Sequence, residues 1–244
     1  MTALDVRGLS KSYGGFRALH DVTFSVGAGE LVALIGPNGA GKTTCFNILG
    51  GQLAPGAGQV ELYGRSLVGL PAHAVWRLGV GRTFQITQTF GSMSVLENVQ
   101  VALTSARGRL LVPFGRLEAE ARAHALLERV GMLDQAARPC ALLAYGDLKR
   151  AELAIALASA PRLLLMDEPT AGMAPQERSA LMALASGLAR NQGIAVLFTE
   201  HDMDMVFGHA DRVLVLHSGE LIASGPPEGV RQDPRVQEVY LGTA

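Results

Sequence analysis

Cysteine and excess charge are both scarce in this chain of 244 residues. The two cysteines, Cys45 and Cys140, show no metal-like spacing, so we expect buried thiols in a reducing compartment rather than a disulfide framework. The formal net charge is −1 and no basic block stands out along the chain. Nucleic-acid binding through contacts to phosphates is therefore disfavoured.

Long hydrophobic runs are also absent. No uninterrupted apolar run reaches the roughly eighteen residues that a membrane-spanning helix needs, and the first residues, MTALDVRGLSKSY, contain no apolar core of a secretory signal. We therefore expect a soluble, cytoplasmic chain that reaches a membrane only through a partner. Apolar residues still make up 48% of the sequence, enough for one large α/β domain, with room for a small inserted lobe.

Apolar residues in two different patterns predict two kinds of strand. Segments 4–9 and 19–26 alternate between apolar and polar residues, which predicts half-buried antiparallel strands, and 58–64 resembles them. Segments 31–36, 162–168, 194–200 and 212–217 are almost continuously apolar, as in strands buried on both faces of a parallel sheet. Helical patterns between them, as at 176–190, predict crossover connections.

The middle of the chain, 86–158, reads as helical and as an insertion between two parts of the sheet domain. Ser94 and Glu97 have the spacing of a helix-capping box, and helical periodicity continues through 115–131. A short helix is predicted near the end of the chain, with Asp233 as its cap and Pro234 at its first position.

A glycine-rich loop directly follows the apolar segment 31–36. GPNGAGKTT matches the pattern G-x-x-x-x-G-K-[ST], in which glycines let successive backbone N–H groups turn toward phosphate oxygens. The helix that follows presents its positive end, the lysine supplies charge, and the hydroxyl after it can ligate Mg²⁺. The predicted nucleotide-binding residues of this loop are Gly36, Pro37, Asn38, Gly39, Ala40, Gly41, Lys42, Thr43 and Thr44.

Acidic residues end the next apolar segment, at the edge of a parallel sheet where ligands bind. Asp167 is placed to hold Mg²⁺, and Glu168 could act as general base toward an attacking water. A third segment ends at His201, which could hydrogen-bond a γ-phosphate or that water. The remaining five histidines show no metal spacing and are interpreted as structural.

Six motifs in this order resemble the ATP-binding subunit of an ABC transporter, over about residues 4–242. SYGGFRAL resembles the loop whose aromatic, here Tyr13, stacks on adenine, and TFQ resembles the loop whose glutamine, Gln85, reaches Mg²⁺. GPNGAGKTT and LLLMDE resemble the Walker A and B motifs, and TEHD the switch-histidine region. LAYGD aligns with the family signature, at Leu143, Ala144, Tyr145, Gly146 and Asp147.

The resemblance implies an α/β fold with a P-loop (RecA-like) mixed sheet core, an antiparallel β subdomain and an inserted helical subdomain. The nucleotide-binding core would comprise 1–85 and 159–244, and the helical subdomain 86–158. It also implies hydrolysis of ATP with Mg²⁺, in a two-fold dimer where each chain's signature completes the partner's nucleotide site. The dimer would be a homodimer or a heterodimer with a paralogous ATPase. The implied partners are transmembrane permease subunits and, indirectly, a solute-binding protein, at the cytoplasmic face of the inner membrane.

Two departures from the family pattern put parts of this site in doubt. Ala144 stands where the family has a serine that donates to the γ-phosphate, and a hydrogen bond to a charged group contributes about 1.5–3 kcal/mol. Tyr145 and Asp147 replace a glycine and a glutamine, and we expect Asp147 to turn away from the phosphates. Ala174 lacks the carboxylate that helps the two sites communicate. We expect a weakened or rearranged site that still works.

Segments outside these motifs indicate which transporter is involved. GRTFQITQTFGSMSVLENVQVA and DPRVQEVYLG resemble the ATPases of branched-chain amino acid importers and their relatives for amides and urea. Apolar residues after Gln85, such as Ile86, Phe90 and Met93, could form a groove for a short helix of the permease or could be core of the lobe. The alternatives are an exporter ATPase, such as that of lipopolysaccharide export, or a non-transport ABC ATPase.

Overall fold

A mixed sheet of six strands runs through the centre of the protein, in the order β10-β9-β3-β8-β7-β6. The computed structural model describes residues 1–83, 89–107 and 115–241. The central parallel strands are β3 (Leu31–Ile35), β7 (Leu163–Asp167), β8 (Ala195–Thr199) and β9 (Arg212–His217). They confirm the four continuously apolar strands predicted from the sequence. All four end at one edge of the sheet, where ligands of such folds bind.

Strand β3 illustrates why these runs are apolar throughout. Leu31, Ala33 and Ile35 pack into a core shared with the large helices, whereas Val32 and Leu34 point into a second core on the opposite face. Alternate residues of a strand face opposite sides of the sheet, so a strand covered on both sides needs apolar residues at every position. The continuous run therefore holds β3 rigidly beneath the loop that follows it.

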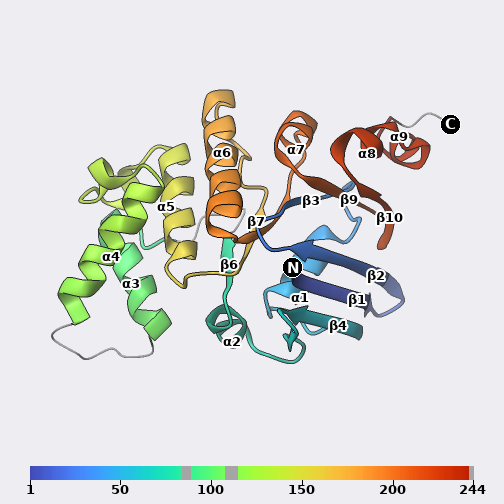
Figure 1. The fold of residues 1–244 in the computed structure, drawn as a ribbon, viewed down its shortest axis with the longest axis horizontal. Helices are drawn as coiled ribbons and strands as arrows, with labels where there is room; N and C mark the ends of the chain where they lie inside the picture. The colour runs from blue at the N-terminus through green and yellow to red at the C-terminus, as the bar shows by residue number, and fades with distance from the viewer. Residues whose placement is uncertain (84–88, 108–114, 242–244) are drawn as a thin grey trace.

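An antiparallel sheet covers the second face. Its order is β2-β1-β4-β5, and β1 (Thr2–Tyr13) and β2 (Phe16–Gly27) confirm the predicted antiparallel pair. The other strands are β4 (Ala57–Leu62) and β5 (Arg65–Ser66). Helix α1 (Lys42–Leu49) contributes Phe46 and Leu49 to the core between the two sheets. Figure 1 shows β1, β2 and β4 side by side below the central sheet.

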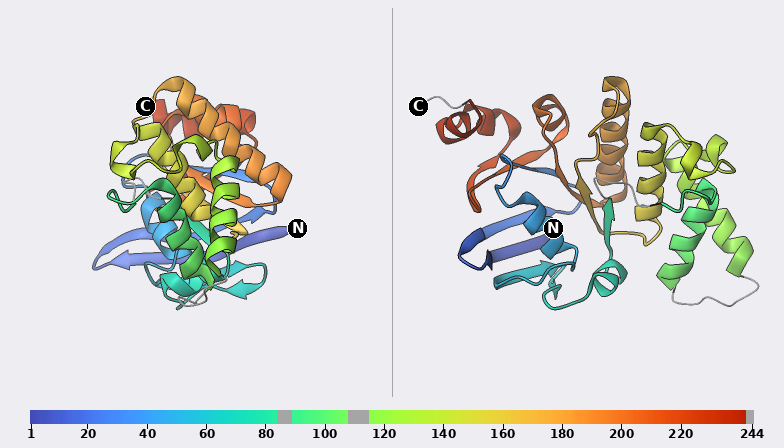
Figure 2. Two further views of the ribbon diagram at one scale, coloured as in Figure 1. Left: turned by 90° about the vertical axis from the view of Figure 1, so that its left-hand side faces the viewer. Right: turned by 180° about the vertical axis from the view of Figure 1, so that it is seen from behind.

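Helices α3, α4 and α5 form a separate group beside the central sheet (Figures 1 and 2). Their bounds are α3 (Val95–Arg107), α4 (Gly115–Arg129) and α5 (Tyr145–Leu157). Ser94 caps α3 as predicted, because its hydroxyl accepts from the Glu97 backbone N–H at 3.2 Å and Glu97 Oε2 accepts from the Ser94 N–H at 2.7 Å. Two 3₁₀ turns, Leu133–Gln135 and Cys140–Leu142, lead from α4 to α5.

The remaining helices lie between or after the strands along the chain. Four of them, α6 (Pro175–Gln192), α7 (Met203–His209), α8 (Pro227–Gln232) and α9 (Pro234–Leu241), contribute to the first core, and α2 (Ala72–Arg77) precedes β6 (Val80–Thr83). The sequence predicted α6 and α9 but not α2, α7, α8, β6 or β10 (Glu220–Gly225). Strand β6 is only four residues long and contains Gly81 and Arg82, so it lacks the apolar run of its neighbours.

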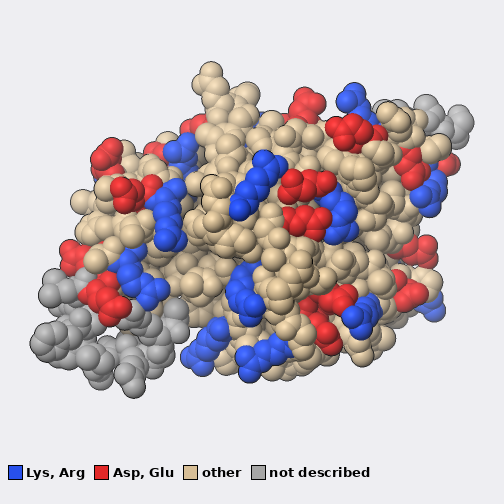
Figure 3. Space-filling view, viewed as in Figure 1, with Lys and Arg blue, Asp and Glu red and all other residues tan. Residues whose placement is uncertain are grey.

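Helix length and surface charge bear on the membrane and nucleic-acid expectations. Within the described residues, no helix is long and apolar enough to cross a membrane. On the face drawn in Figure 3, basic and acidic side chains are both spread over the surface. A few basic side chains lie near one another at the lower centre, but no large continuous basic area is seen.

Candidate functional site

The loop between β3 and α1 is built around two glycines that no other residue could replace. Gly36 has φ 154°, and a Cβ there would lie 2.1 Å from the Leu216 carbonyl oxygen. Gly41 has φ 107°, and its Cβ would lie 2.5 Å from the Ala18 carbonyl oxygen. Both positions therefore combine a positive φ with a backbone approach that excludes a side chain. The fixed positions of the motif follow from this packing.

Lys42 begins α1 and lies mostly buried beneath the loop. Its Nζ donates to the carbonyl oxygens of Gly36 at 2.6 Å and Pro37 at 3.1 Å. Burial lowers the pKa of Lys42 below its ordinary value, and the nearby charges of Glu168 and Asp167 oppose that shift. Thr43, next on the first turn of α1, is exposed. The loop thus holds its cation next to two carboxylates and leaves a hydroxyl accessible.

Some of the other predicted loop residues are buried and hydrogen-bonded to neighbouring segments, and others are exposed. Ala40 is buried, and its carbonyl oxygen accepts from the Gly219 N–H at 3.0 Å. Asn38 and Gly39 are exposed at the tip, Thr44 is half-buried, and Pro37 lies between the tip and the strand. The tip is therefore exposed, while Ala40 is held by the turn between β9 and β10.

Tyr13 lies at the end of β1, on the hairpin that leads to β2. Its side chain is 49% exposed, and the Lys11 ammonium sits 5.6 Å from the ring centroid. Further along that hairpin, Ala18 makes the close approach to Gly41. The hairpin that carries the aromatic residue is thus packed directly against the glycine-rich loop.

Asp167, Glu168 and His201 meet at the carboxyl edge of β7 and β8. His201 Nε2 lies 2.9 Å from Glu168 Oε1. The Glu168 side chain is 19% exposed and that of His201 is 50% exposed, so the pair faces solvent from a partly covered position. Glu168 also has φ 46°, a left-handed conformation that non-glycine residues rarely adopt. The structure therefore brings together the three residues that the sequence assigned to metal and water.

Arg82 is a contributor to this site that the sequence analysis missed. Its Nη2 lies 3.3 Å from Asp167 Oδ2 and donates to Asn47 Oδ1 at 3.0 Å, while Nη1 donates to Gln52 Oε1 at 2.6 Å. The guanidinium thus ties the acid at the end of β7 to the C-terminal end of α1. Nothing in the sequence except its place before TFQ could have pointed to it. Gln85 itself lies outside the described residues.

The signature segment forms the start of α5, in the helical group. Ala144 is the N-cap, with φ −63° and ψ 155° and no side-chain cap, and Tyr145 is the first helical residue. Asp147 lies within the first turn of the helix. Leu143 is half-buried and Gly146 is buried. In the described part of the chain, no hydrogen bond or ion pair joins this segment to the glycine-rich loop.

Comparison with sequence families decides the identity. A profile described as ABC transporter matches residues 19–171, more than half of the chain. The chain belongs to the ABC transporter ATP-binding family. A second profile, described as Branched-chain amino acid ATP-binding cassette transporter, matches residues 220–244.

Individual relatives agree with the assignment of this ABC ATPase. The high-affinity branched-chain amino acid transport ATP-binding protein LivG of Salmonella typhimurium is 42% identical over 250 residues, covering 99% of this chain and 98% of that protein. A solved ABC transporter cassette, MJ1267 in its ADP conformation, superposes with a TM-score of 0.89 at 30% identity, covering 100% of both chains. A dimeric post-hydrolysis cassette, MJ0796 bound to ADP and Pi, gives 0.80 at 25% identity, covering 92% of this chain and 98% of that one.

The predicted family and fold are thereby confirmed. The chain is an ABC-type ATP hydrolase whose P-loop sheet carries an antiparallel sheet and a set of helices. Its C-terminal segment, matched by the second profile, returns to the nucleotide loop. Burial raises the pKa of Tyr240 in α9 to about 12, a rise that a hydrogen bond with the Gly36 backbone opposes.

Glu177 is a second residue that the sequence analysis missed in this ATPase. Its Oε2 accepts from the Ala174 backbone N–H at 3.2 Å, and a Cβ on Gly146 would lie 2.7 Å from its Oε1. Tyr145 likewise packs against Gly172, where a Cβ would lie 3.3 Å from the ring. The Glu177 carboxylate therefore caps the start of α6 at the Ala174 backbone. The spacing A-P-Q-E at the start of α6 was the available signal.

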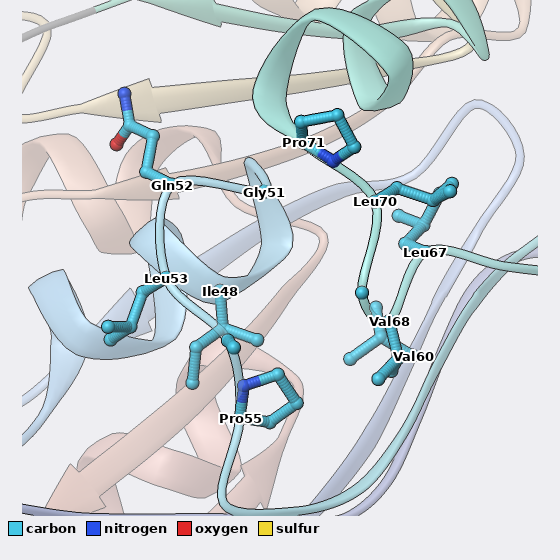
Figure 4. A pocket seen from close by; sticks show the side chains of 12 residues that line it. Ile48, Gly51, Gln52, Leu53, Pro55, Val60, Leu67, Val68, Leu70 and Pro71 are labelled. Atoms are coloured by element: carbon cyan, nitrogen blue, oxygen red, sulfur yellow. The ribbon is translucent and has the colours of Figure 1, made fainter.

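A mostly apolar pocket of about 210 Å³ lies away from the nucleotide loop (Figure 4). In Figure 4, Leu53, Pro55 and Val60 surround it together with the turn that precedes α2. Its lining comes from the end of α1 and the segments beyond it: Ile48, Gly51, Gln52, Leu53, Ala54, Pro55, Val60, Leu67, Val68, Gly69, Leu70 and Pro71. None of the predicted site residues is among them.

Proposed function

We propose that this ATPase is the motor subunit of a transporter that takes up branched-chain amino acids or related small solutes. The observation that carries the proposal is the match of residues 220–244 to the branched-chain amino acid profile, together with 42% identity to LivG over nearly the whole chain. A general ABC ATPase would need only the nucleotide-binding motifs. Similarity that extends through the C-terminal segment favours the amino acid group.

The site residues divide the work of ATP hydrolysis between them. Lys42 and backbone N–H groups of the loop would stabilise phosphate charge, helped by the N-terminal end of α1. The Ala40 N–H is the exception among them, because it donates to the Pro37 carbonyl oxygen at 3.2 Å. Glu168 would polarise the attacking water, and His201, 2.9 Å away, would orient it and the γ-phosphate. Tyr13, exposed on its hairpin against the loop, would stack on adenine. These groups would bind and orient ATP and activate water, which attacks the γ-phosphorus and displaces ADP without a covalent intermediate on the protein.

Magnesium fits the oxygen atoms that the site offers. Asp167 and the exposed Thr43 hydroxyl supply hard oxygen donors, the type that Mg²⁺ prefers. Gln85 is proposed as a further ligand, although it lies outside the described residues. When bound, the ion would neutralise phosphate charge during transfer. Arg82 would hold the second oxygen of Asp167, so that one oxygen is kept in place while the other remains near Thr199.

The signature residues 143–147 would act on the nucleotide of a partner subunit. In this chain they begin a helix, so the N–H groups of Tyr145 and Gly146 are free of intrahelical partners and could donate to phosphate. The dimeric cassette MJ0796 bound to ADP and Pi supports such a pairing. ATP would close the dimer because it contacts both chains, and hydrolysis would let it open.

The helical subdomain, which we take as 86–158, would carry the contact to the permease. Phe90 is 60% exposed and Leu142 is 64% exposed. The Ala141 N–H donates to the Gly91 carbonyl oxygen at 3.0 Å, which places these two apolar side chains on neighbouring segments. Met93 is half-buried, whereas Ile86 lies outside the described residues. The nucleotide-binding core would be 1–85 and 159–244, located at the cytoplasmic face of the membrane through the permease.

Purification from membranes with identification of the attached chains tests the proposal. We expect permease subunits to co-purify, and the complex rebuilt in vesicles to accumulate leucine, isoleucine or valine when supplied with ATP and a solute-binding protein. The Phe90→Asp variant should detach from the permease, whereas Leu133→Asp, at an exposed apolar residue elsewhere in the lobe, should not. Recovery with DNA, ribosomes or a lipopolysaccharide exporter instead of a permease would contradict it.

A further inference from the structure

Thr199 contacts both acids of the hydrolytic site through a single hydroxyl. Strands β7 and β8 pair in a register that places Asp167 opposite Thr199. The Thr199 hydroxyl donates to Asp167 Oδ1 at 2.8 Å and accepts from the Glu168 backbone N–H at 3.0 Å. Because a hydroxyl has one hydrogen to donate, its donation is committed to the acid proposed to hold magnesium.

The backbone that Thr199 holds is the strained one. Glu168 has φ 46°, and a non-glycine residue stays in that region only where its surroundings enforce it. The Glu168 N–H donates to the Thr199 hydroxyl at 3.0 Å, so Thr199 holds this peptide group directly. The strain and its restraint therefore occur at the same peptide group.

Glu200 directly follows β8 and holds the backbone on the C-terminal side of Glu168. Glu200, 4% exposed, accepts at Oε1 from the Thr170 N–H at 2.8 Å and from the Thr170 hydroxyl at 2.7 Å. His201 then reaches Glu168 Oε1. Residues 199–201 thus make three separate contacts around Glu168. Thr199 holds its N–H, Glu200 holds the backbone two residues later, and His201 contacts its carboxylate.

Packing alone does not require a hydroxyl at position 199. Thr199 is fully buried at the end of a strand whose other residues are Ala195, Val196, Leu197 and Phe198. Valine has nearly the same shape and would fill the same space, while a buried hydroxyl costs free energy unless it is hydrogen-bonded. The polar group therefore contributes through its two partners and not through its volume.

We propose that Thr199 is a positioning residue that presets Asp167 and Glu168 for magnesium binding and water activation. The proposal rests on the roles proposed above for those two acids. Thr199 would not touch ATP itself; it fixes where both carboxylates point before the nucleotide arrives. Losing the hydroxyl would release Glu168 from its left-handed conformation and let Asp167 rotate toward Arg82.

The test compares Thr199→Val, which removes the hydroxyl and keeps the shape, with Thr199→Ser, which keeps the hydroxyl. Thr104→Val, which removes a hydroxyl bonded to the Gln100 carbonyl oxygen in α3, is the matched control. Each variant is measured in the full chain for kcat and KM of ATP hydrolysis, for the magnesium concentration giving half-maximal rate, and by calorimetry for ADP affinity with and without magnesium.

For Thr199→Val we expect kcat to fall about tenfold to a hundredfold, the scale of one lost hydrogen bond to a charged group. The magnesium requirement should rise about tenfold to a hundredfold, the usual range for losing a group that orients a metal ligand. The gain in ADP affinity that magnesium gives should shrink. KM and magnesium-free ADP affinity should stay unchanged. Thr199→Ser should restore kcat and the magnesium response, and Thr104→Val should match the parent chain.

Parent values of kcat and magnesium response in Thr199→Val would overturn the proposal. Equal losses in Thr199→Ser and Thr199→Val would also overturn it, because they would point to the lost methyl packing. If the valine variant fails to fold, Thr199→Ala is compared with Thr199→Ser instead. Alanine and serine differ only by the hydroxyl, so this pair isolates the same group. A parent chain that neither binds nor hydrolyses ATP would instead contradict the proposed function, independently of Thr199.

Discussion

Two segments of the protein are proposed to bind phosphate, and different contacts hold them in place. The loop 36–44 is fixed by backbone contact, since side chains at Gly36 or Gly41 would collide with carbonyl oxygens of neighbouring strands. The signature 143–147 is fixed by side chains: its buried Gly146 meets the flexible end of Glu177. The first segment therefore tolerates no variation at its key positions, whereas the second can change if its neighbours change with it.

This difference explains which motif departs from the family pattern. The loop matches its pattern at every fixed position, while the signature has Ala144, Tyr145 and Asp147 in place of the usual residues. Helix α5 begins within the signature segment, at Tyr145. Its N-terminal N–H groups are therefore present although Ala144 stands in place of the serine. The signature thus keeps its backbone N–H donors although Ala144 has no hydroxyl.

Gly41→Ala should have the largest effect. We expect about 2–5 kcal/mol lower free energy of unfolding, from left-handed strain and a clash with the Ala18 carbonyl, and loss of ATP binding. Urea denaturation and calorimetry measure both. Gly64→Ala is the control, because Gly64 has φ 75° but nothing within 4 Å of its Cβ, so it should lose only about 1–2 kcal/mol. Equal losses in the two variants would show that the close approach is unimportant.

Ala144→Ser should have a smaller effect of opposite sign. The residue is an N-cap without a side-chain cap, so a hydroxyl should stabilise α5 by about 1 kcal/mol. ATP turnover of the transporter complex should rise by at most about tenfold to a hundredfold, the scale of one hydrogen bond to a charged group. The present signature is proposed to be weakened but working. An increase from undetectable to robust turnover would contradict it.

Gly146→Ala should change stability least. Alanine favours the helix by about 1 kcal/mol over glycine, but the new Cβ displaces Glu177 from Ala174 and costs a similar amount. We expect a net change below about 1 kcal/mol. In the Glu177→Ala background the same substitution should become stabilising. A loss as large as that of Gly41→Ala would remove the distinction between the two segments.

The sequence predicted what local pattern determines. Continuous apolar runs identified the four central strands, the glycine spacing identified the loop, and Ser94 and Glu97 identified the start of α3. Strand β6 and helix α7 were missed because one is too short to form an apolar run and the other occupies a stretch of seven residues after His201. Strand β6 depends on tertiary packing, whereas α7 has a local start signal at its N-cap Asp202, whose side chain accepts from the Asp204 and Met205 N–H groups.

The supporting contacts of the site could not be predicted in the same way. These contacts join segments that lie far apart in the sequence. They are the register of Thr199 against Asp167, the contact of Arg82 with that acid, and the hydrogen bonds from Thr170 to Glu200. A single sequence carries no record of such pairs. Glu177 differs, because its helix-start spacing was visible locally.

Pairing of two ATPase chains around ATP is the central claim, and Glu168→Gln tests it most directly. With the proposed base removed, ATP should stay bound and hold the dimer closed. Light scattering with magnesium and ATP should then give about twice the 25.7 kDa mass of one chain, or two ATPase chains per permease complex. The same variant carrying Lys42→Ala should remain unpaired. A single chain under every condition, alone and with the permease, would contradict the account.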